Sequence, residues 1–323
     1  LPNEQPNEQS NKQPNEQRNQ QPTTLLALRI GKVSPPLFWV HDADGDTGLY
    51  LHLARRLKSD RTIYVIGPRT ADDAPLAYSR IQRLAADYVE QIRQVQPQGP
   101  YCVGGLCAGG VVAFEIGLQL EQLGETVVLT LMDAPAPGAK KRLGRVANQR
   151  LANLGQSLIL SSGVKTSFLE RVQKVWRKGS NLLRYEISLK SEKDLASVRA
   201  RVVVWYQDRH LPVPVIVRGL SVRELLIFAY EQYKPRQKFV GKLLLLRATQ
   251  GNGTDGDRPY VEEYADPLLG WQAFCQSAIS LSEVPGGHST MLSDKNALVL
   301  ARAIEDILLE CCALTREKTP CSV

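Results

Sequence analysis

From residue 101 to residue 110 the chain reads Tyr-Cys-Val-Gly-Gly-Leu-Cys-Ala-Gly-Gly. The first three residues form an apolar run typical of a strand, and a helical pattern begins near residue 110. Glycine and alanine crowd both sides of Cys107, as a sharp strand-to-helix turn requires when it holds one side chain out in a strained conformation. We therefore predict that this stretch forms a nucleophile elbow, and that the nucleophile it presents is a thiol.

Strand-like and helix-like runs alternate on both sides of this stretch, beginning at residue 25. The alternation predicts an α/β fold with a mostly parallel central sheet and helices on both faces. It stops between about residues 139 and 240, so we expect residues 25–138 and 241–323 to form the core. The expected strands are 37–40, 62–66, 101–103, 127–132, 242–247 and 279–284, and the expected helices are about 47–58, 78–96, 110–123 and 294–312.

Residues 139–240 have a helical, amphipathic pattern and carry most of the positive charge. They contain 21 Lys and Arg against 7 Asp and Glu, a net of +14, whereas the rest of the chain has a net of −7. We interpret them as an insertion between two sheet strands. A solvated helical face explains some of this charge, and a docking surface for an acidic partner is the functional interpretation. Nucleic acid is disfavoured, because no recognisable binding motif and few aromatic residues accompany the charge.

The overall composition is that of a soluble globular protein. Of the 323 residues 43% are hydrophobic, which is ample for a core, yet no apolar stretch approaches the length of a membrane span. Six cysteines without regular spacing indicate reduced thiols rather than a disulfide framework or a zinc site. With no signal peptide in the sequence, we expect a cytoplasmic protein with no membrane partner and no bound metal.

The first 24 residues repeat Pro-Asn-Glu-Gln at 2–5, 6–9 and 14–17 and contain almost no apolar side chains. Such a segment cannot bury enough surface to offset its ordering entropy, so we expect residues 1–24 to be a disordered low-complexity linker. The chain also begins with Leu1 rather than Met. Both observations favour a domain cut from the end of a longer polypeptide, and a tagged or trimmed free-standing protein is the alternative.

A nucleophile at an elbow needs a base to remove its proton and an acid to orient that base. In a doubly wound hydrolase sheet these follow in the order nucleophile, acid, histidine. Asp133 comes directly after the apolar run 127–132, and His288 lies in a glycine-rich loop after the last expected strand. We therefore expect Cys107, Asp133 and His288 to form a triad, with Asp255 or Asp257 as alternative sources of the carboxylate.

The other three histidines are less suitably placed for the base. His52 lies within a helical run, His210 lies in the insertion, and His41 ends a strand but precedes the nucleophile. The loop that begins at His41 is where such folds build an oxyanion hole. We expect its two donors to be the backbone N–H of Ala108, which also opens a helix, and the backbone N–H of Ala43.

Several motifs, each weak alone, occur in a fixed order and together are specific. They are His41-Asp-Ala-Asp-Gly45, Leu53-Ala-Arg-Arg-Leu57, Gly105-Leu-Cys-Ala-Gly-Gly110, Ala113-Phe-Glu115, Leu131-Met-Asp133, Tyr233-Lys-Pro235, Gly241-Lys-Leu-Leu-Leu-Leu246, Gly270-Trp271 and Val284-Pro-Gly-Gly-His288-Ser-Thr-Met-Leu292. Across about residues 35–312 the chain thereby resembles the type I thioesterase domains that end nonribosomal peptide synthetases and modular polyketide synthases, part of the α/β-hydrolase superfamily. The insertion, residues 139–240, falls where that family places its mobile helical lid.

The resemblance implies that Cys107 takes an acyl or peptidyl chain from the phosphopantetheine thioester of an upstream carrier domain. His288 would act as general base and then general acid, held by Asp133, while the N–H groups of Ala43 and Ala108 stabilise the tetrahedral intermediates. No permanently bound cofactor is implied, since the substrate arrives on the phosphopantetheine arm. Carrier domains of this class tend to be acidic, which suits a basic lid. The apolar run 211–217 is either a lining of the acyl chamber or an ordinary extended connector.

The family's usual residue at position 107 is serine, so this chain departs from the pattern at its nucleophile. We favour a native, functional cysteine, because thiol-for-thiol exchange is nearly isoenergetic and the enzyme thioester stays activated toward an internal amine or hydroxyl. Release would then be a macrocyclisation or another intramolecular attack. An engineered replacement of serine and a cysteine that performs ordinary hydrolysis are the alternatives. A free-standing hydrolase of small esters or lactones and an inactive docking module are the competing functions.

Overall fold

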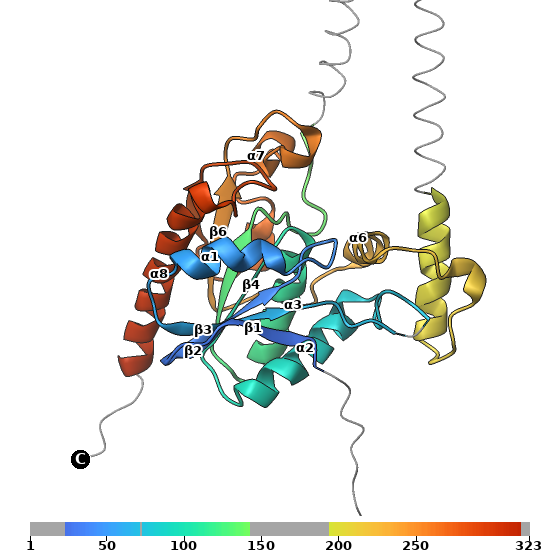
Figure 1. Cartoon of the computed structure of the whole chain (residues 1–323), viewed down its shortest axis with the longest axis horizontal. Coiled ribbons are helices and arrows are strands. Elements are labelled where there is room, and N and C mark those ends of the chain that lie inside the picture. Colours follow the sequence, from blue (N-terminus) through green and yellow to red (C-terminus); the bar gives the residue numbers. More distant parts are fainter. Residues whose placement is uncertain (1–22, 72, 143–193, 318–323) are drawn as a thin grey trace, which may run out of the picture.

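The computed structural model describes residues 23–71, 73–142 and 194–317. Within them, seven strands form one sheet in the order β1-β3-β2-β4-β5-β6-β7 (Figure 1). Every pairing is parallel except that of the edge strand β1 with β3. The predicted α/β fold is confirmed. The strands are β1 (Leu25–Arg29), β2 (Val33–Val40), β3 (Arg61–Ile66), β4 (Tyr101–Leu106), β5 (Val127–Met132), β6 (Lys242–Ala248) and β7 (Ser280–Val284).

The two central strands are buried along their whole length because both faces of the sheet are covered. All six residues of β4 and all six of β5 are buried, as in parallel sheets generally. Their ends are in register: Leu106 pairs with Met132, which in turn pairs with Leu246 of β6. The loops that follow these strands therefore meet at one carboxyl edge, where open α/β sheets bind their ligands.

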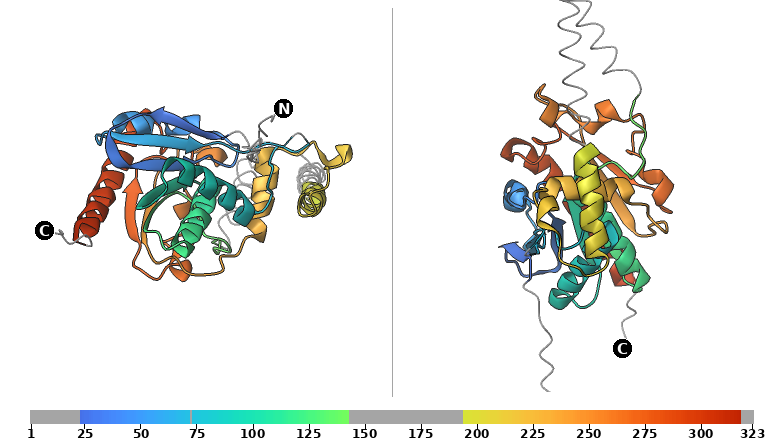
Figure 2. Two further views of the ribbon diagram at one scale, coloured as in Figure 1. Left: turned by 90° about the horizontal axis from the view of Figure 1, so that it is seen from below. Right: turned by 90° about the vertical axis from the view of Figure 1, so that its right-hand side faces the viewer.

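Helices cover the sheet on both faces (Figure 2). Helices α2, α3 and α6 contribute to one apolar cluster, and α1 and α8 contribute to a second cluster on the other face. None of the helices in the described parts of the chain is both long and apolar enough to cross a membrane. The helices are α1 (Leu51–Arg56), α2 (Ile81–Val95), α3 (Ala108–Gln122), α6 (Val222–Gln232), α7 (Tyr260–Glu263) and α8 (Asp294–Glu317), with short 3-10 turns η1 (Gly48–Tyr50), η2 (Val215–Val217), η3 (Asp255–Asp257) and η4 (Trp271–Phe274).

The described part of the predicted insertion comprises residues 139–142 and 194–240, and residues 143–193 lie outside the described chain. Residues 194–207 are helical, and α6 begins with a capping box in which Ser221 and Glu224 satisfy each other's backbone N–H groups. The loop between β3 and α2 holds this part in place, because Arg80 forms an ion pair with Asp208. In the run 211–217, Val213 and Val217 are buried, whereas Val215 and Ile216 are exposed. The run includes the 3-10 turn η2, so it is not a fully extended connector.

The first strand differs most from the expectation. β1 was not predicted, because it is a short edge strand. Only its first residue, Leu25, is buried, and buried and exposed residues do not alternate along it. It pairs antiparallel to β3, and the chain just before it is anchored where the side-chain oxygen of Gln91 accepts hydrogen bonds from Thr23 and Thr24. The helix predicted at 78–96 is observed as Ile81–Val95, and the one predicted at 110–123 begins two residues earlier, at Ala108.

Candidate active site

Cys107 stands between β4 and α3 with φ 55° and ψ −125°, a conformation that L-residues adopt only under strain. The backbone packs so closely here that larger neighbours would not fit. A Cβ atom on Gly109 would lie 2.1 Å from the carbonyl oxygen of His41, and one on Gly105 would lie 2.5 Å from the carbonyl carbon of Gly109. The sharp strand-to-helix turn predicted from the small residues is thus present, and it holds the thiol out at the carboxyl edge of the sheet.

The structure brings the three residues of the predicted triad together. His288 Nδ1 lies 2.7 Å from Asp133 Oδ2, so the imidazole donates a hydrogen bond from Nδ1 to the carboxylate. Its other nitrogen faces Cys107. Asp133 directly follows β5 and is fully buried, and its Oδ1 accepts a hydrogen bond from the N–H of Ala248 at 3.3 Å. Buried in this way, the carboxylate fixes both the tautomer and the orientation of the histidine.

Cys107 and His288 stabilise each other's charged forms. Burial opposes the charge on His288, but its hydrogen bonds to Asp133 and Cys107 outweigh burial and raise its pKa to about 10. Burial likewise opposes the thiolate, but the hydrogen bond and charge of His288, with smaller contributions from Tyr260 and the N–H of Ala108, bring the pKa of Cys107 below its ordinary value. The pair is thereby shifted toward a thiolate and an imidazolium, the reactive form of a cysteine nucleophile.

The two expected oxyanion donors belong to the elbow and to the loop after β2. Ala108 N–H hydrogen-bonds to the Cys107 sulfur and opens α3, where the helix dipole is positive. Ala43 is buried in the loop after β2 and belongs to the same apolar cluster as Ala108. Asp42 shapes this loop, because its Oδ1 accepts hydrogen bonds from the N–H groups of Asp44 and Asp46, each at 2.9 Å. The assignment of these N–H groups as oxyanion donors stays a prediction.

His41 supports this loop and is not placed as a base. It is fully buried; its Nδ1 hydrogen-bonds to the carbonyl oxygen of Asp42 at 2.7 Å and its Nε2 to the hydroxyl of Tyr88 at 2.9 Å. Burial is the main cause that lowers its pKa to about 4, with the hydrogen bond to Asp42 acting in the opposite direction. The imidazole is thus neutral, with Nδ1 donating and Nε2 accepting.

The buried neutral His41 predicts a specific loss of stability in acid. Its pKa is about 4 in the folded protein and about 6.5 when unfolded, so between these values the unfolded chain binds more protons. The free energy of unfolding therefore decreases as pH falls from 6.5 through 4, by up to about 3 kcal/mol from this group. Urea unfolding across that range measures the decrease. His41→Asn keeps a donor and an acceptor but does not titrate, and an equally steep decrease in that variant would contradict the assignment.

Asp257, one alternative source of the catalytic carboxylate, holds the histidine loop instead. It is buried, and its carboxylate accepts hydrogen bonds from Ser289 N–H at 3.0 Å and Thr290 N–H at 2.8 Å, and from both hydroxyls. Burial opposes its charge, but these bonds and one from Asn252 N–H lower its pKa to about 2. Its backbone oxygen also accepts from His288 N–H at 3.2 Å. The side chain of Asp255, the other alternative, lies outside the described residues.

Two residues of the site were missed by the sequence analysis. Tyr50 is fully buried; its hydroxyl donates to the carbonyl oxygen of Val40 at 2.7 Å and accepts from Leu106 N–H at 2.9 Å, which fastens the elbow to the oxyanion loop. Tyr260 lies beside the thiol, with its hydroxyl 3.5 Å from Cys107 Sγ. The available signal for Tyr260 was positional, because it belongs to the segment that follows β6 at the same sheet edge.

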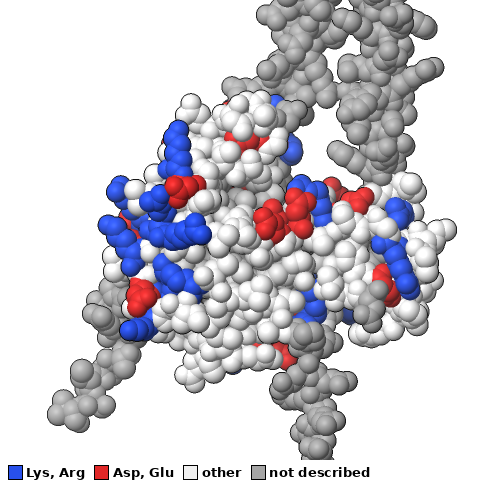
Figure 3. Space-filling model, in the orientation of Figure 1, with Lys and Arg blue, Asp and Glu red and all other residues white. Residues whose placement is uncertain are grey.

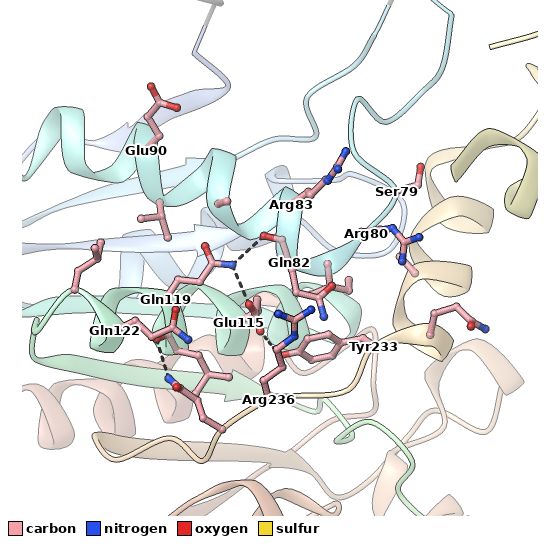
Figure 4. Close-up of a pocket in the computed structure, with 18 of the residues that line it drawn as sticks. Ser79, Arg80, Gln82, Arg83, Glu90, Glu115, Gln119, Gln122, Tyr233 and Arg236 are labelled. Atoms are coloured by element: carbon pink, nitrogen blue, oxygen red, sulfur yellow. Dashed lines mark hydrogen bonds between the residues drawn. The ribbon is translucent and has the colours of Figure 1, made fainter. Parts of the chain in front are cut away.

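A groove of about 950 Å³ lies elsewhere, among α2, α3 and α6 (Figure 4). Its lining includes none of Cys107, Asp133 and His288. Inside it, Glu115 accepts a hydrogen bond from the hydroxyl of Tyr233 at 2.6 Å. Two of the sequence motifs therefore meet here as a connection between α3 and the end of α6.

Comparison with known sequences identifies relatives that are much longer than this chain. One is polyketide synthase PksR of Bacillus subtilis (strain 168), 40% identical over 114 residues, which make up 34% of this chain and 4% of that protein. Another is the inactive atromentin synthetase invA6 of Paxillus involutus, 26% identical over 298 residues, which make up 88% of this chain and 28% of the relative. This chain thus spans only a small part of the length of either relative.

Solved structures show the same architecture. The holo form of AB3403, a four-domain nonribosomal peptide synthetase bound to AMP and glycine, superposes with a TM-score of 0.56 at 24% identity, over 88% of this chain and 20% of that one, and supports the fold alone. The NocB thioesterase domain, in covalent complex with a fluorophosphonate nocardicin G analogue, has a TM-score of 0.50 at 25% identity, over 85% and 95%. The family model of the thioesterase domain matches residues 35–308, and this chain therefore belongs to the thioesterase domain family.

Proposed function

We propose that this thioesterase domain takes an acyl or peptidyl chain from the phosphopantetheine thioester of a carrier domain onto Cys107, and releases it by macrocyclisation or hydrolysis. The observation that carries the proposal is the line of contacts from the thiol through His288 to Asp133, with 2.7 Å between Nδ1 and Oδ2. Nucleophile, base and orienting acid are the groups that acyl transfer requires, and they occur in the chain order of a doubly wound hydrolase.

In the first half-reaction the thiolate of Cys107 attacks the carbonyl carbon of the carrier thioester. A carbon–sulfur bond forms, and the negative charge moves to the carbonyl oxygen, where the N–H groups of Ala43 and Ala108 would stabilise it. Collapse of this intermediate breaks the bond to the pantetheine sulfur, and the His288 imidazolium gives that sulfur its proton. The products are a free pantetheine thiol, a neutral His288 and an acyl thioester on Cys107.

In the second half-reaction the neutral His288 takes a proton from the releasing nucleophile, which is water or an amine or hydroxyl of the chain itself. Attack on the enzyme thioester again places charge in the oxyanion site, and collapse expels the Cys107 thiolate beside the imidazolium. Because one thioester has been exchanged for another, the acyl group keeps its activation until this step. That property favours intramolecular closure, since a strained ring or an amide has to form from the stored energy.

The basic insertion is the proposed docking region for an acidic carrier. Among the described residues 194–240 there are eight Lys and Arg against four Asp and Glu. A second group of exposed basic side chains gathers over α1 and α8 on the face in Figure 3. Opposite charge on a carrier would speed its encounter with either region and would be screened by salt. We also propose that residues 139–240 form a helical lid and that the domain is cytoplasmic. In the cytoplasm the free thiols of Cys102, Cys107 and Cys275 would stay reduced.

Acyl transfer to Cys107 is tested by mass spectrometry after brief incubation with an acyl thioester of a pantetheine mimic. We expect the protein to gain the mass of one acyl group, on the peptide that contains Cys107, and the product to show whether water has been added. Consumption of the thioester with the acyl group on another residue, or with none on the protein at any time, would overturn the proposal.

A further inference from the structure

Among the described residues, Tyr260 contacts all three members of the triad. Its hydroxyl lies 3.5 Å from Cys107 Sγ, its ring centre lies 4.4 Å from that of His288, and its backbone N–H points to Asp133 Oδ2 at 3.4 Å. It is the first residue of α7, in the segment that leads away from β6. A single residue therefore contacts the nucleophile, the base and the orienting acid.

The surroundings of Tyr260 keep its hydroxyl protonated. The phenol is partly buried, and burial, followed by the negative charge on Cys107, raises its pKa far above the ordinary value. Its ring is held in place by Tyr264, whose ring packs edge-on at 5.5 Å between centres. A neutral phenol next to a thiolate can only be the donor of the hydrogen bond between them, and a hydrogen bond to a charged group is roughly twice as strong as a neutral one.

We propose that Tyr260 is a further catalytic residue, whose hydroxyl donates a hydrogen bond to the Cys107 sulfur while its ring holds the imidazole of His288 against it. The proposal rests on Cys107 being the acyl acceptor. The sulfur is anionic twice in the reaction, before acyl transfer and again as the leaving group of release. In both states it has the hydroxyl of Tyr260 and the N–H of Ala108 as donors, beside the imidazolium.

The role of Tyr260 predicts a shift in the pH profile of Cys107 rather than a simple loss of reactivity. In Tyr260→Phe the ring still packs on His288, but the donor to sulfur is gone. We expect the midpoint of Cys107 alkylation by iodoacetamide to rise by about one pH unit, so that the rate below the midpoint falls about tenfold. The plateau at high pH should stay the same or increase, because a thiolate with a weaker hydrogen bond is more nucleophilic.

The experiment follows alkylation of the Cys107 peptide by mass spectrometry between pH 4 and 10 in the full chain. Tyr264→Phe is the matched control, because Tyr264 packs on Tyr260 in the same segment, whereas the hydroxyl that contacts the sulfur is that of Tyr260. The midpoint of Cys107 alkylation should not move in this variant. Incorporation of 3,5-difluorotyrosine at position 260 makes the phenol a stronger donor and should move the midpoint downward. This second change keeps the test decisive if Tyr260→Phe folds poorly.

An unmoved midpoint in both changed proteins, or an equal shift in Tyr264→Phe, would overturn the role of Tyr260. Alkylation requires no acyl substrate, so its outcome is separate from that of the proposed function. A shifted midpoint without acylation of Cys107 would contradict the acyl-transfer proposal alone. Acylation of Cys107 with an unmoved midpoint would contradict the role of Tyr260 alone.

Discussion

Replacement of Cys107 by alanine is expected to lower release of an acyl chain from a loaded carrier by on the order of 10⁶-fold, the effect of removing a triad nucleophile. That factor corresponds to about 8 kcal/mol of transition-state stabilisation. The physical reason is that no other described side chain at this edge offers a thiolate to the acyl carbon. The folded structure should persist, since alanine is smaller than cysteine and the elbow depends on close contacts of the backbone, such as the one between Gly109 and His41.

The matched control for Cys107→Ala is Cys275→Ala. Cys275 is also free, but it is buried away from the triad, and burial raises its pKa to about 11, so it is not a nucleophile at neutral pH. Release should stay within about twofold of the unchanged protein, because the variant removes no catalytic group. Single-turnover release from an acylated carrier is the measurement. Substantial release by Cys107→Ala would mean that another nucleophile, or water acting directly, attacks the carrier thioester.

The parts of the site that could be predicted from the sequence are those in which one residue type has few alternatives. Only four histidines occur, so His288 had few competitors. Asp133 was favoured because it directly follows a strand, although Asp255 and Asp257 also fit the chain order. The elbow was predictable because it needs several small residues in one short stretch. The central strands were found for a similar reason: with both faces covered, they are continuous apolar runs.

The parts that could not be predicted depend on packing between distant segments. Tyr260 and Asp257 act through contacts to residues 153 and 32 positions away, and nothing in their local sequence marks them. β1 is an edge strand that is held by β3 and by Gln91 rather than by a pattern of its own. Tyrosine and aspartate are common in loops, and short strands are common at the edges of sheets. Only the fold therefore gives Tyr260, Asp257 and β1 their roles.

The carboxylate of Asp133 offers the second large effect, because it determines which imidazole nitrogen carries the proton. In Asp133→Asn an amide occupies nearly the same volume, and Ala248 N–H, which donates to Oδ1, favours the amide oxygen at that position. Tyr260 N–H points to the other position, Oδ2, which His288 Nδ1 also contacts. The amide N–H₂ would then face His288 Nδ1, which would have to become an acceptor. The proton would move to the nitrogen that faces Cys107, and a neutral imidazole in that tautomer cannot accept a proton from the releasing nucleophile.

We therefore expect Asp133→Asn to lower release by about 10⁴-fold while the protein stays folded. The loss of the carboxylate also removes a main cause of the raised pKa of His288, so the thiolate of Cys107 should be less favoured and its alkylation should slow. Asp306→Asn on the exposed side of α8 is the control and should change neither rate. Single-turnover release and iodoacetamide alkylation, measured on the same preparations, separate the two effects. If Asp133→Asn loses release but Cys107 is still alkylated rapidly, Asp133 orients His288 without sustaining the charge pair. If neither the rate of release nor the rate of alkylation changes, Asp133 is not a member of the triad.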